Sequence, residues 1–110
     1  MPTSKTSMLR YKKIALTTGD PDGIGFEIVC KALSLIGPQA DTIFFIYRDH
    51  KQSKKQSRYF KILDEHFLRL TFNNQIAALG FVESLVKKNA VPKNILIDLA
   101  LKRFCCPLGS

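Results

Sequence analysis

Apolar residues change their spacing twice in the first half of the chain. Residues 13–17 are β-prone and run directly into a glycine-rich turn, which predicts a strand. After the turn, apolar residues recur at spacings of one, three and four, which predicts one face of a helix that stops at residues 37–38. That face would carry Ile28, Val29, Ala32, Leu33 and Ile36. Residues 42–47 are continuously apolar, as in a strand buried on both faces of a parallel sheet, so residues 13–47 are predicted to form a βαβ unit.

The second half of the chain has a weaker pattern. Residues 48–58 are polar and basic, and we expect a loop or the start of an exposed helix there. A third strand is predicted from Phe67, Leu68, Leu70 and Phe72. Asn74 is expected to cap a helix. The apolar stripe of that helix would be Ile76, Leu79, Val82 and Val86. Residues 95–101 are nearly all apolar, and periodicity alone cannot assign them to helix or strand.

These elements predict the α/β class. We expect a parallel, βαβ-based three-layer domain over residues 13–110, incomplete as it stands, after a polar extension over residues 1–12. No apolar run approaches the length that crosses a bilayer, and no secretory signal is recognisable. We therefore expect a cytoplasmic protein without a membrane partner.

The chain has a formal charge of +8, which suits an anionic partner such as a nucleotide, a phosphorylated metabolite or a nucleic acid. The basic stretch over residues 51–61 contains Tyr59 and Phe60, whose rings could stack on bases. A solvated helix face explains the same stretch more simply, and no nucleic-acid-binding motif accompanies it. We therefore do not predict a nucleic-acid partner.

The cysteines and histidines suggest no metal site. Cys30, Cys105 and Cys106 fit neither a disulfide framework nor a zinc site, and we expect them to be reduced. His50 and His66 each follow acidic residues, but neither has the spacing of a three-ligand site, so both are interpreted as surface residues.

The segment most informative about chemistry is residues 18–27, TGDPDGIGFE, between the first strand and the first helix. A helix start offers unpaired N–H groups and a positive dipole end, and glycines let a ligand approach the backbone. The alternative is a tight turn in which Asp22 or Glu27 caps the helix. The carboxylates of Asp20, Asp22 and Glu27 could coordinate magnesium, but capping and interaction with the helix dipole explain them without a metal ion. No Gly-Lys-Ser/Thr follows, so this is not a Walker loop. The candidate cofactor-binding residues are Gly19, Asp20, Gly23, Ile24 and Gly25.

The segment 13–49 resembles the start of the 4-hydroxythreonine-4-phosphate dehydrogenase family, in which a first strand runs into a Gly-Asp-Pro-x-Gly-Ile-Gly-x-Glu-Ile loop. The matching residues are Gly19, Asp20, Pro21, Gly23, Ile24, Gly25, Glu27 and Ile28. Phe26 stands where the family often has proline. The rest of the chain resembles the family only weakly.

The resemblance implies an isocitrate/isopropylmalate dehydrogenase-like fold and a homodimeric enzyme of pyridoxal phosphate synthesis. Such an enzyme oxidises 4-phosphohydroxy-threonine or a similar phosphorylated hydroxy acid, with NAD as the hydride acceptor and a divalent metal (Zn, Mg or Co) polarising the hydroxyl. The family's metal-binding histidines lie far downstream of the segment that this chain resembles. We therefore assign no catalytic residue and no metal ligand in this chain, and we expect it to be inactive alone.

Two alternatives remain open. Residues 18–25 also resemble the Thr-Gly-xxx-Gly-Ile-Gly turn of short-chain dehydrogenases, and Asp49 would be placed to bind the ribose of NAD(P). Tyr47 and Lys51 have that family's Tyr-xxx-Lys spacing but follow the second strand rather than lying on a later helix. The other alternative is a non-catalytic, truncated copy of the dehydrogenase.

Overall fold

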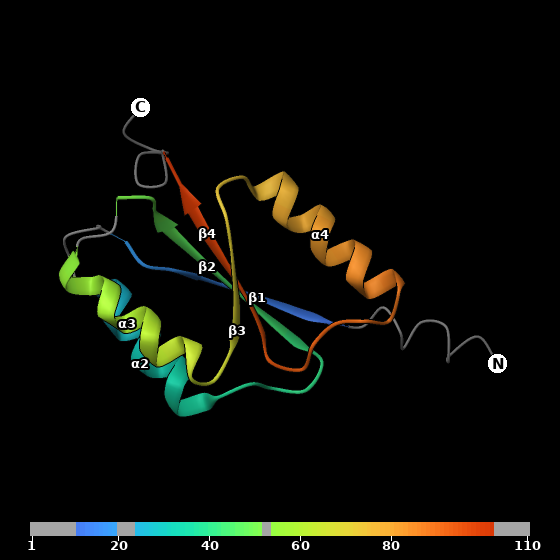
Figure 1. Cartoon of the computed structure of the whole chain (residues 1–110), viewed down its shortest axis with the longest axis horizontal. Coiled ribbons are helices and arrows are strands. Elements are labelled where there is room, and N and C mark those ends of the chain that lie inside the picture. The colour runs from blue at the N-terminus through green and yellow to red at the C-terminus, as the bar shows by residue number, and fades with distance from the viewer. Residues whose placement is uncertain (1–10, 20–23, 52–53, 103–110) are drawn as a thin grey trace.

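The computed structural model describes residues 11–19, 24–51 and 54–102, with only the backbone at residues 54–56. Strands and helices alternate along these residues (Figure 1). They are β1 Lys12–Thr17, α2 Gly25–Ile36, β2 Thr42–Asp49, α3 Lys54–Asp64, β3 Leu68–Phe72, α4 Gln75–Lys87 and β4 Ile95–Leu101. The strands predicted near residues 13, 42 and 68 are confirmed, and residues 95–101 form a strand as well.

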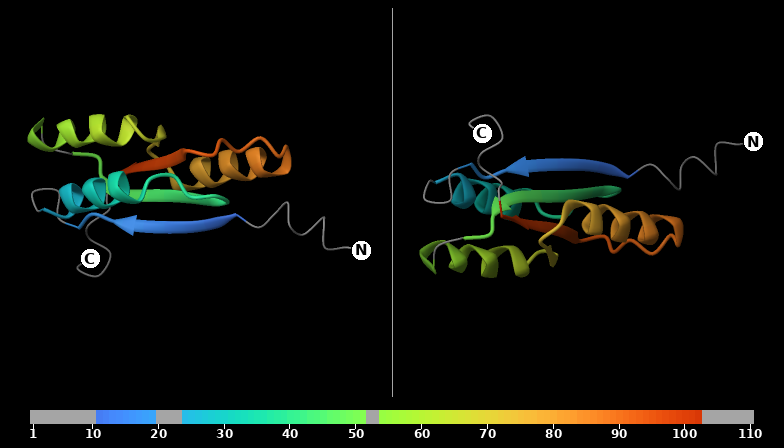
Figure 2. Two further views of the ribbon diagram at one scale, coloured as in Figure 1. Left: turned by 90° about the horizontal axis from the view of Figure 1, so that it is seen from below. Right: turned by 90° about the horizontal axis from the view of Figure 1, so that it is seen from above.

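All pairs in the sheet are parallel, and the strand order is β1-β2-β4-β3. β1 pairs with β2 from Lys12↔Thr42 to Thr17↔Tyr47, which confirms the predicted βαβ unit. The chain then runs through α3 to β3, which forms the other outer strand of the described sheet. After α4, β4 pairs with both β2 and β3 and so lies between them. Figure 2 shows β1 at the outer margin of the sheet. The α/β class is therefore observed.

Side chains of the central strands alternate between two cores. The first core lies under α2 and α3 and consists of Phe26, Cys30, Leu33, Phe44, Ile46, Tyr59, Leu63, Phe67 and Leu96. The second lies under α4 and consists of Ile43, Phe45, Ala78, Val82, Ile95, Ile97 and Leu99. The helices thus cover opposite faces in three layers, and β2 is buried on both sides as predicted.

The predicted buried face of the first helix is partly wrong, because Leu33 is buried and Val29 packs against the first core as predicted, but the other three residues are exposed. α2 buries Phe26, Cys30 and Leu33, whereas Ile28 and Ile36 are exposed. The helix is apolar on nearly all sides, so periodicity could not fix its rotation about its own axis. The same error is smaller in α4, which buries Ala78 and Val82 but leaves Ile76 81% exposed.

The predicted loop at residues 48–58 is also partly wrong. Arg48 and Asp49 belong to β2 and are buried, and α3 begins at Lys54. Polar residues suggested the end of the strand, but the charge of Arg48 is matched inside the protein by Asp98. The strand therefore continues through two charged residues.

Asn74 caps α4 as predicted, because its side chain accepts a hydrogen bond from the Ala77 N–H at 3.1 Å. Cys30 is buried as a free thiol, whereas Cys105 and Cys106 lie outside the described residues. No helix in the described part of the chain is long and apolar enough to span a membrane.

Candidate functional site

The glycine loop, residues 18–25, follows β1 at the edge of the sheet where the parallel strands end. Ligands of open α/β sheets bind at this carboxyl edge, because the loops that leave the strands there diverge to opposite faces. Here the chain leaves β1 and β2 toward α2 and α3 on one face, and leaves β3 toward α4 on the other. The glycine loop is thus at the carboxyl edge, although β1 and its neighbour β2 both lead to the same face, so the divergence lies between β2 and β3 rather than beside the loop.

The two ends of the glycine loop are packed against each other. Thr18 is buried, and both its N–H and its Oγ1 donate to the Tyr47 carbonyl of β2, at 3.2 and 3.3 Å. A Cβ atom on Gly25 would lie 1.9 Å from the Thr18 carbonyl oxygen. Only glycine therefore allows the first turn of α2 to rest directly on the end of β1.

Gly19 is favoured as glycine by its backbone conformation, whereas Gly25 is required by a close approach of two backbone segments. The φ of Gly19 is +74°, a backbone conformation that disfavours other residues, but a Cβ at this position would have no atom within 4 Å. Among the described residues, none therefore occupies the position of a side chain at Gly19.

The start of α2 is not capped by the residue that precedes it. Ile24 occupies the N-cap position, is exposed, and has no side-chain capping hydrogen bond. Glu27, in the first turn, instead accepts a hydrogen bond from Lys31 Nζ at 2.6 Å. The hydrogen bonds from Lys31 and then Tyr59 lower the pKa of Glu27, so this carboxylate is held along the helix surface. This geometry does not support Glu27 as the cap.

Of the predicted cofactor-binding residues, Gly19, Ile24 and Gly25 lie together at the carboxyl edge. Asp20 and Gly23 lie outside the described residues, as does Asp22, which was the other candidate cap.

Asp49 ends β2 beside the end of β1. Its carboxylate is buried, and Oδ1 accepts a hydrogen bond from the Lys51 N–H at 2.7 Å. The imidazole Nδ1 of His50 lies 3.6 Å from the same oxygen. The position fits an acidic residue that binds a ribose, but this oxygen is already used to shape the turn after β2.

The two histidines lie at opposite edges of the sheet. His50 follows β2 at the carboxyl edge, whereas His66 lies in the turn between α3 and β3, at the amino edge. Among the residues that the structure describes, no three His, Cys, Asp or Glu side chains are grouped so that they could hold a metal ion. The described residues thus do not fit a divalent metal, and we derive no reaction step through one.

A buried ionic cluster that the sequence analysis missed lies on the α2/α3 face. Asp98, in the middle of β4, is fully buried. It accepts hydrogen bonds from Arg48 Nε at 2.7 Å and Arg48 Nη2 at 3.1 Å, from Arg69 Nη1 at 3.1 Å, and from Thr71 Oγ1 at 3.0 Å. These contacts join β4 to both neighbouring strands through charge-assisted hydrogen bonds.

The cluster extends to α3. Arg69 forms two further hydrogen bonds to the Asp64 carboxylate, at 2.8 and 3.2 Å. The guanidinium carbons of Arg48 and Arg69 lie 4.8 and 4.1 Å from the centroid of the Phe60 ring. Two arginines and two aspartates balance in charge, so the cluster fastens the sheet to α3 rather than offering a reactive group. The lone Asp98 in an apolar run was the signal for it, because a buried carboxylate requires a cation.

The aromatic residues of the basic stretch face inward. Tyr59 is buried, and Phe60 packs against the core under α2 and α3. Phe26 contacts both rings edge-on, at centroid distances of 6.4 and 5.0 Å. These two rings are therefore part of the protein core.

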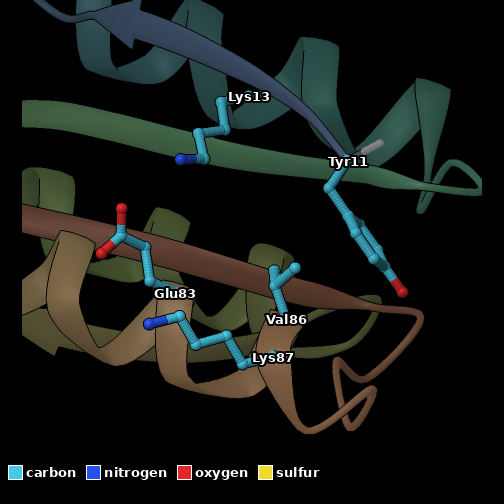
Figure 3. A pocket seen from close by; sticks show the side chains of 5 residues that line it. All are labelled: Tyr11, Lys13, Glu83, Val86 and Lys87. Atoms are coloured by element: carbon cyan, nitrogen blue, oxygen red, sulfur yellow. The ribbon is translucent and has the colours of Figure 1, made fainter. Parts of the chain in front are cut away.

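Two hollows lie away from the glycine loop. One of about 270 Å³ lies between β1 and the second half of α4, with Lys13, Glu83 and Lys87 around it (Figure 3). The other, of about 470 Å³, is lined by the loops before β2 and before β4. Both lie toward the amino ends of the strands, opposite the edge at which such sheets bind ligands.

Comparison of the chain with protein-family models, with curated proteins and with solved structures finds no significant match. These comparisons therefore do not assign the chain to a family.

Proposed function

We propose that the chain is the N-terminal portion of a cytoplasmic, NAD-dependent, divalent-metal-requiring dehydrogenase of pyridoxal phosphate synthesis. Its substrate would be 4-phosphohydroxy-threonine or a similar phosphorylated hydroxy acid, and the complete enzyme would be a homodimer. The observation that carries the proposal is the contact of Gly25 with the Thr18 carbonyl, within a loop whose residues match the family motif. NAD supplies the hydride acceptor when it is bound.

The described ends of the glycine loop have the properties that a nucleotide requires. The first turn of α2 presents N–H groups and the positive end of the helix dipole at the carboxyl edge, and Ile24 has no side chain that could cap them. No atom of the described residues lies within 4 Å of the position that a Cβ of Gly19 would take. The net charge of +8 favours the approach of an anionic cofactor. In this proposal Gly19, Asp20, Gly23, Ile24 and Gly25 lie against the cofactor.

The strand order argues against the short-chain dehydrogenase alternative. In dinucleotide-binding folds the strand before the glycine loop has neighbours on both sides, in the order 3-2-1-4. In the described sheet β1 is an outer strand, and β4 pairs with β2 and β3. The position of Asp49 is the observation that still favours this alternative.

The test is a titration of the chain with NADH, followed by nicotinamide fluorescence, for two matched glycine variants. Gly19 and Gly37 have almost the same φ, +74° and +72°, and a Cβ at either position would meet no atom within 4 Å. Gly19→Ala and Gly37→Ala therefore each place a side chain at a positive φ, which introduces backbone strain of about 1–3 kcal/mol. Only Gly19 lies at the carboxyl edge, because Gly37 follows the last residue of α2.

We expect the wild-type chain and Gly37→Ala to bind NADH alike, and Gly19→Ala to bind it at least about tenfold more weakly, equivalent to about 1.4 kcal/mol. Equal losses in the two variants would mean that the loop acts only through stability. Absence of binding by the wild-type chain would count against a cofactor site formed by these residues.

The non-catalytic alternative is separated by the intact mass of the natural protein in its own cells. A product several times heavier than this 12.4 kDa chain supports the dehydrogenase. A product of this mass favours a truncated, non-catalytic copy.

A further inference from the structure

β3 is the outer strand of the described sheet at the edge opposite β1, and it has an apolar side. Leu70 and Phe72 pack on the α4 face, and Leu68 shares that face because side chains two residues apart point the same way. Leu68 is 45% exposed. Phe81 of α4 is 37% exposed and contacts Phe72, with 5.5 Å between ring centroids. An apolar surface thus lies beside a free strand edge.

The backbone of β3 offers hydrogen bonds at this edge. The Leu68 N–H donates to the Asn94 carbonyl, at 2.8 Å, on the side of β4. Backbone groups alternate in direction along a strand, so the N–H and C=O groups of Arg69 and Thr71 point to the open side. Such a row of groups is a template for another strand.

The other open edge is protected in a way that β3 is not. β1 carries Lys12 and Lys13, and lysines on an edge strand discourage pairing with a second sheet. β3 carries no lysine, and the charge of Arg69 is held by Asp64 and Asp98 over the sheet. Of the two edges, β3 is therefore the one suited to a partner strand.

We propose that β3 pairs antiparallel with β3 of a second copy of this chain, about a two-fold axis at Leu70. The sequence Leu-Arg-Leu-Thr-Phe alternates apolar and polar residues identically in both directions, as an isologous contact requires. Leu68 of each copy lies opposite Phe72 of the other, and the two Leu70 residues lie opposite each other. This interface does not depend on the proposed function.

The charge of Arg69 favours this register over its neighbours. Arg69 of each copy lies opposite Thr71 of the other, where the two exchange backbone hydrogen bonds. A register shifted toward Arg69 would place the two arginines opposite each other, which is unfavourable. A register shifted the other way would place Leu68 opposite Asn74, outside the strand. The central register alone pairs apolar residues throughout and opposes no like charges.

The first experiment is sedimentation equilibrium of the full chain with a matched pair of lysine variants. Leu68 and Ile14 are apolar, exposed to similar extents (45% and 40%), and lie on opposite edge strands. We expect a dimer whose dissociation constant rises about tenfold or more in Leu68→Lys, because two apolar cross-strand pairs are lost per dimer. Ile14→Lys is expected to leave it unchanged. Added salt should strengthen the dimer, since each copy carries +8.

The second experiment tests the register by disulfide crosslinking. In the proposed pairing the two Leu70 Cα atoms form a non-hydrogen-bonded pair about 4.5 Å apart, which lies within the range that a disulfide spans. Leu70→Cys, in a background where Cys105 and Cys106 are replaced by serine, is expected to give a covalent dimer under mild oxidation. Ala15→Cys, on the β1 edge, is the control and should remain monomeric on denaturing gels.

Three outcomes would overturn the proposal. A wild-type chain that is monomeric at all concentrations lacks the interface. Equal weakening by Leu68→Lys and Ile14→Lys would show a general effect of charge. A dimer that is broken only by Ile14→Lys, or crosslinked only by Ala15→Cys, would place the contact at β1.

Discussion

The two faces of the sheet are built from the same two central strands but are stabilised differently. On the α4 face, the buried residues that β2 and β4 contribute to the second core are Ile43, Phe45, Ile95, Ile97 and Leu99, all of them apolar. On the α2/α3 face the same strands begin with Phe44 and Leu96 and continue into Arg48 and Asp98. The core under α4 is thus apolar, and the buried Asp49 at the end of β2 accepts a hydrogen bond from the turn that follows. The α2/α3 face instead combines apolar packing with a buried ionic cluster that joins three strands.

The difference shows what the ionic cluster contributes. A buried ion pair adds little net stability compared with apolar residues of the same volume, but removal of one partner leaves an uncompensated charge. The α2/α3 face therefore specifies the register of the strands more strictly than the α4 face does. Asp98 accepts these hydrogen bonds only when β2, β3 and β4 are in their observed register.

The largest effect is expected for Asp98→Ala. The change removes the only carboxylate to which Arg48 is seen to pair in the described structure, so the buried guanidinium is left unpaired. We expect the free energy of unfolding to fall by about 3–5 kcal/mol, measured by urea denaturation. Asp64→Ala is the control, because Asp64 is 47% exposed and Arg69 keeps Asp98. The expected loss of unfolding free energy for Asp64→Ala is below about 1 kcal/mol. Equal losses for the two variants would show that the buried position of Asp98 gives it no special role in stability.

A somewhat smaller effect is expected for Ile97→Ala, one residue away on the opposite face. Ile97 is fully buried under α4, so the change leaves a cavity but no unpaired charge. The expected loss of unfolding free energy is about 3 kcal/mol, in the same urea assay. If Ile97→Ala were clearly more damaging than Asp98→Ala, the α4 face would be the one on which stability depends.

The smallest effect concerns pH and the thiol of Cys30 on the α2/α3 face. Burial, and then the charge of Asp98, raise the pKa of Cys30 from 9.0 to about 12. Because the folded-state pKa is raised, the folded chain keeps a proton that the unfolded chain loses above pH 9. The stability contribution is therefore complete below pH 9 and declines as pH rises toward 12, by at most about 1.4 kcal/mol per pH unit.

Urea denaturation between pH 8 and pH 10 measures this decline, with Cys30→Ala as the control. The variant lacks the thiol, so its unfolding free energy should fall less steeply with pH than that of the wild-type chain. Parallel slopes would show that the thiol does not titrate differently in the folded and unfolded states.

The first two strands were predictable because their residues leave little choice, whereas β4 was not, since an apolar run such as residues 95–101 suits a helix or a strand. Residues 42–47 are apolar on both sides and too short for a buried helix, and the glycines after Thr17 end the first strand. The rotation of α2 was not predictable, since Phe26 and Ile28 are equally suited to burial. The close approach of Gly25 to Thr18 belongs to tertiary structure, so a helical period does not reveal it.

The candidate site was predictable only in position. A glycine loop after a strand indicated the carboxyl edge, where Gly19 and Gly25 are found. The ionic cluster was missed because its members lie far apart in the sequence: Arg48, Arg69 and Asp98 come from three strands. Arg48 was interpreted as the start of a loop, since a charged residue suggests solvent unless its partner is known.

The strand order also has a consequence for synthesis on the ribosome. β4 is the last strand of the described sheet to be translated, yet it lies between β2 and β3, which do not pair with each other. Until Leu101 has emerged, β2 lacks a partner strand at the edge that faces β4, and β3 has no partner strand in the described sheet. The nascent chain therefore exposes two unpaired strands for the time needed to translate α4 and β4, and this interval is when it most needs a chaperone.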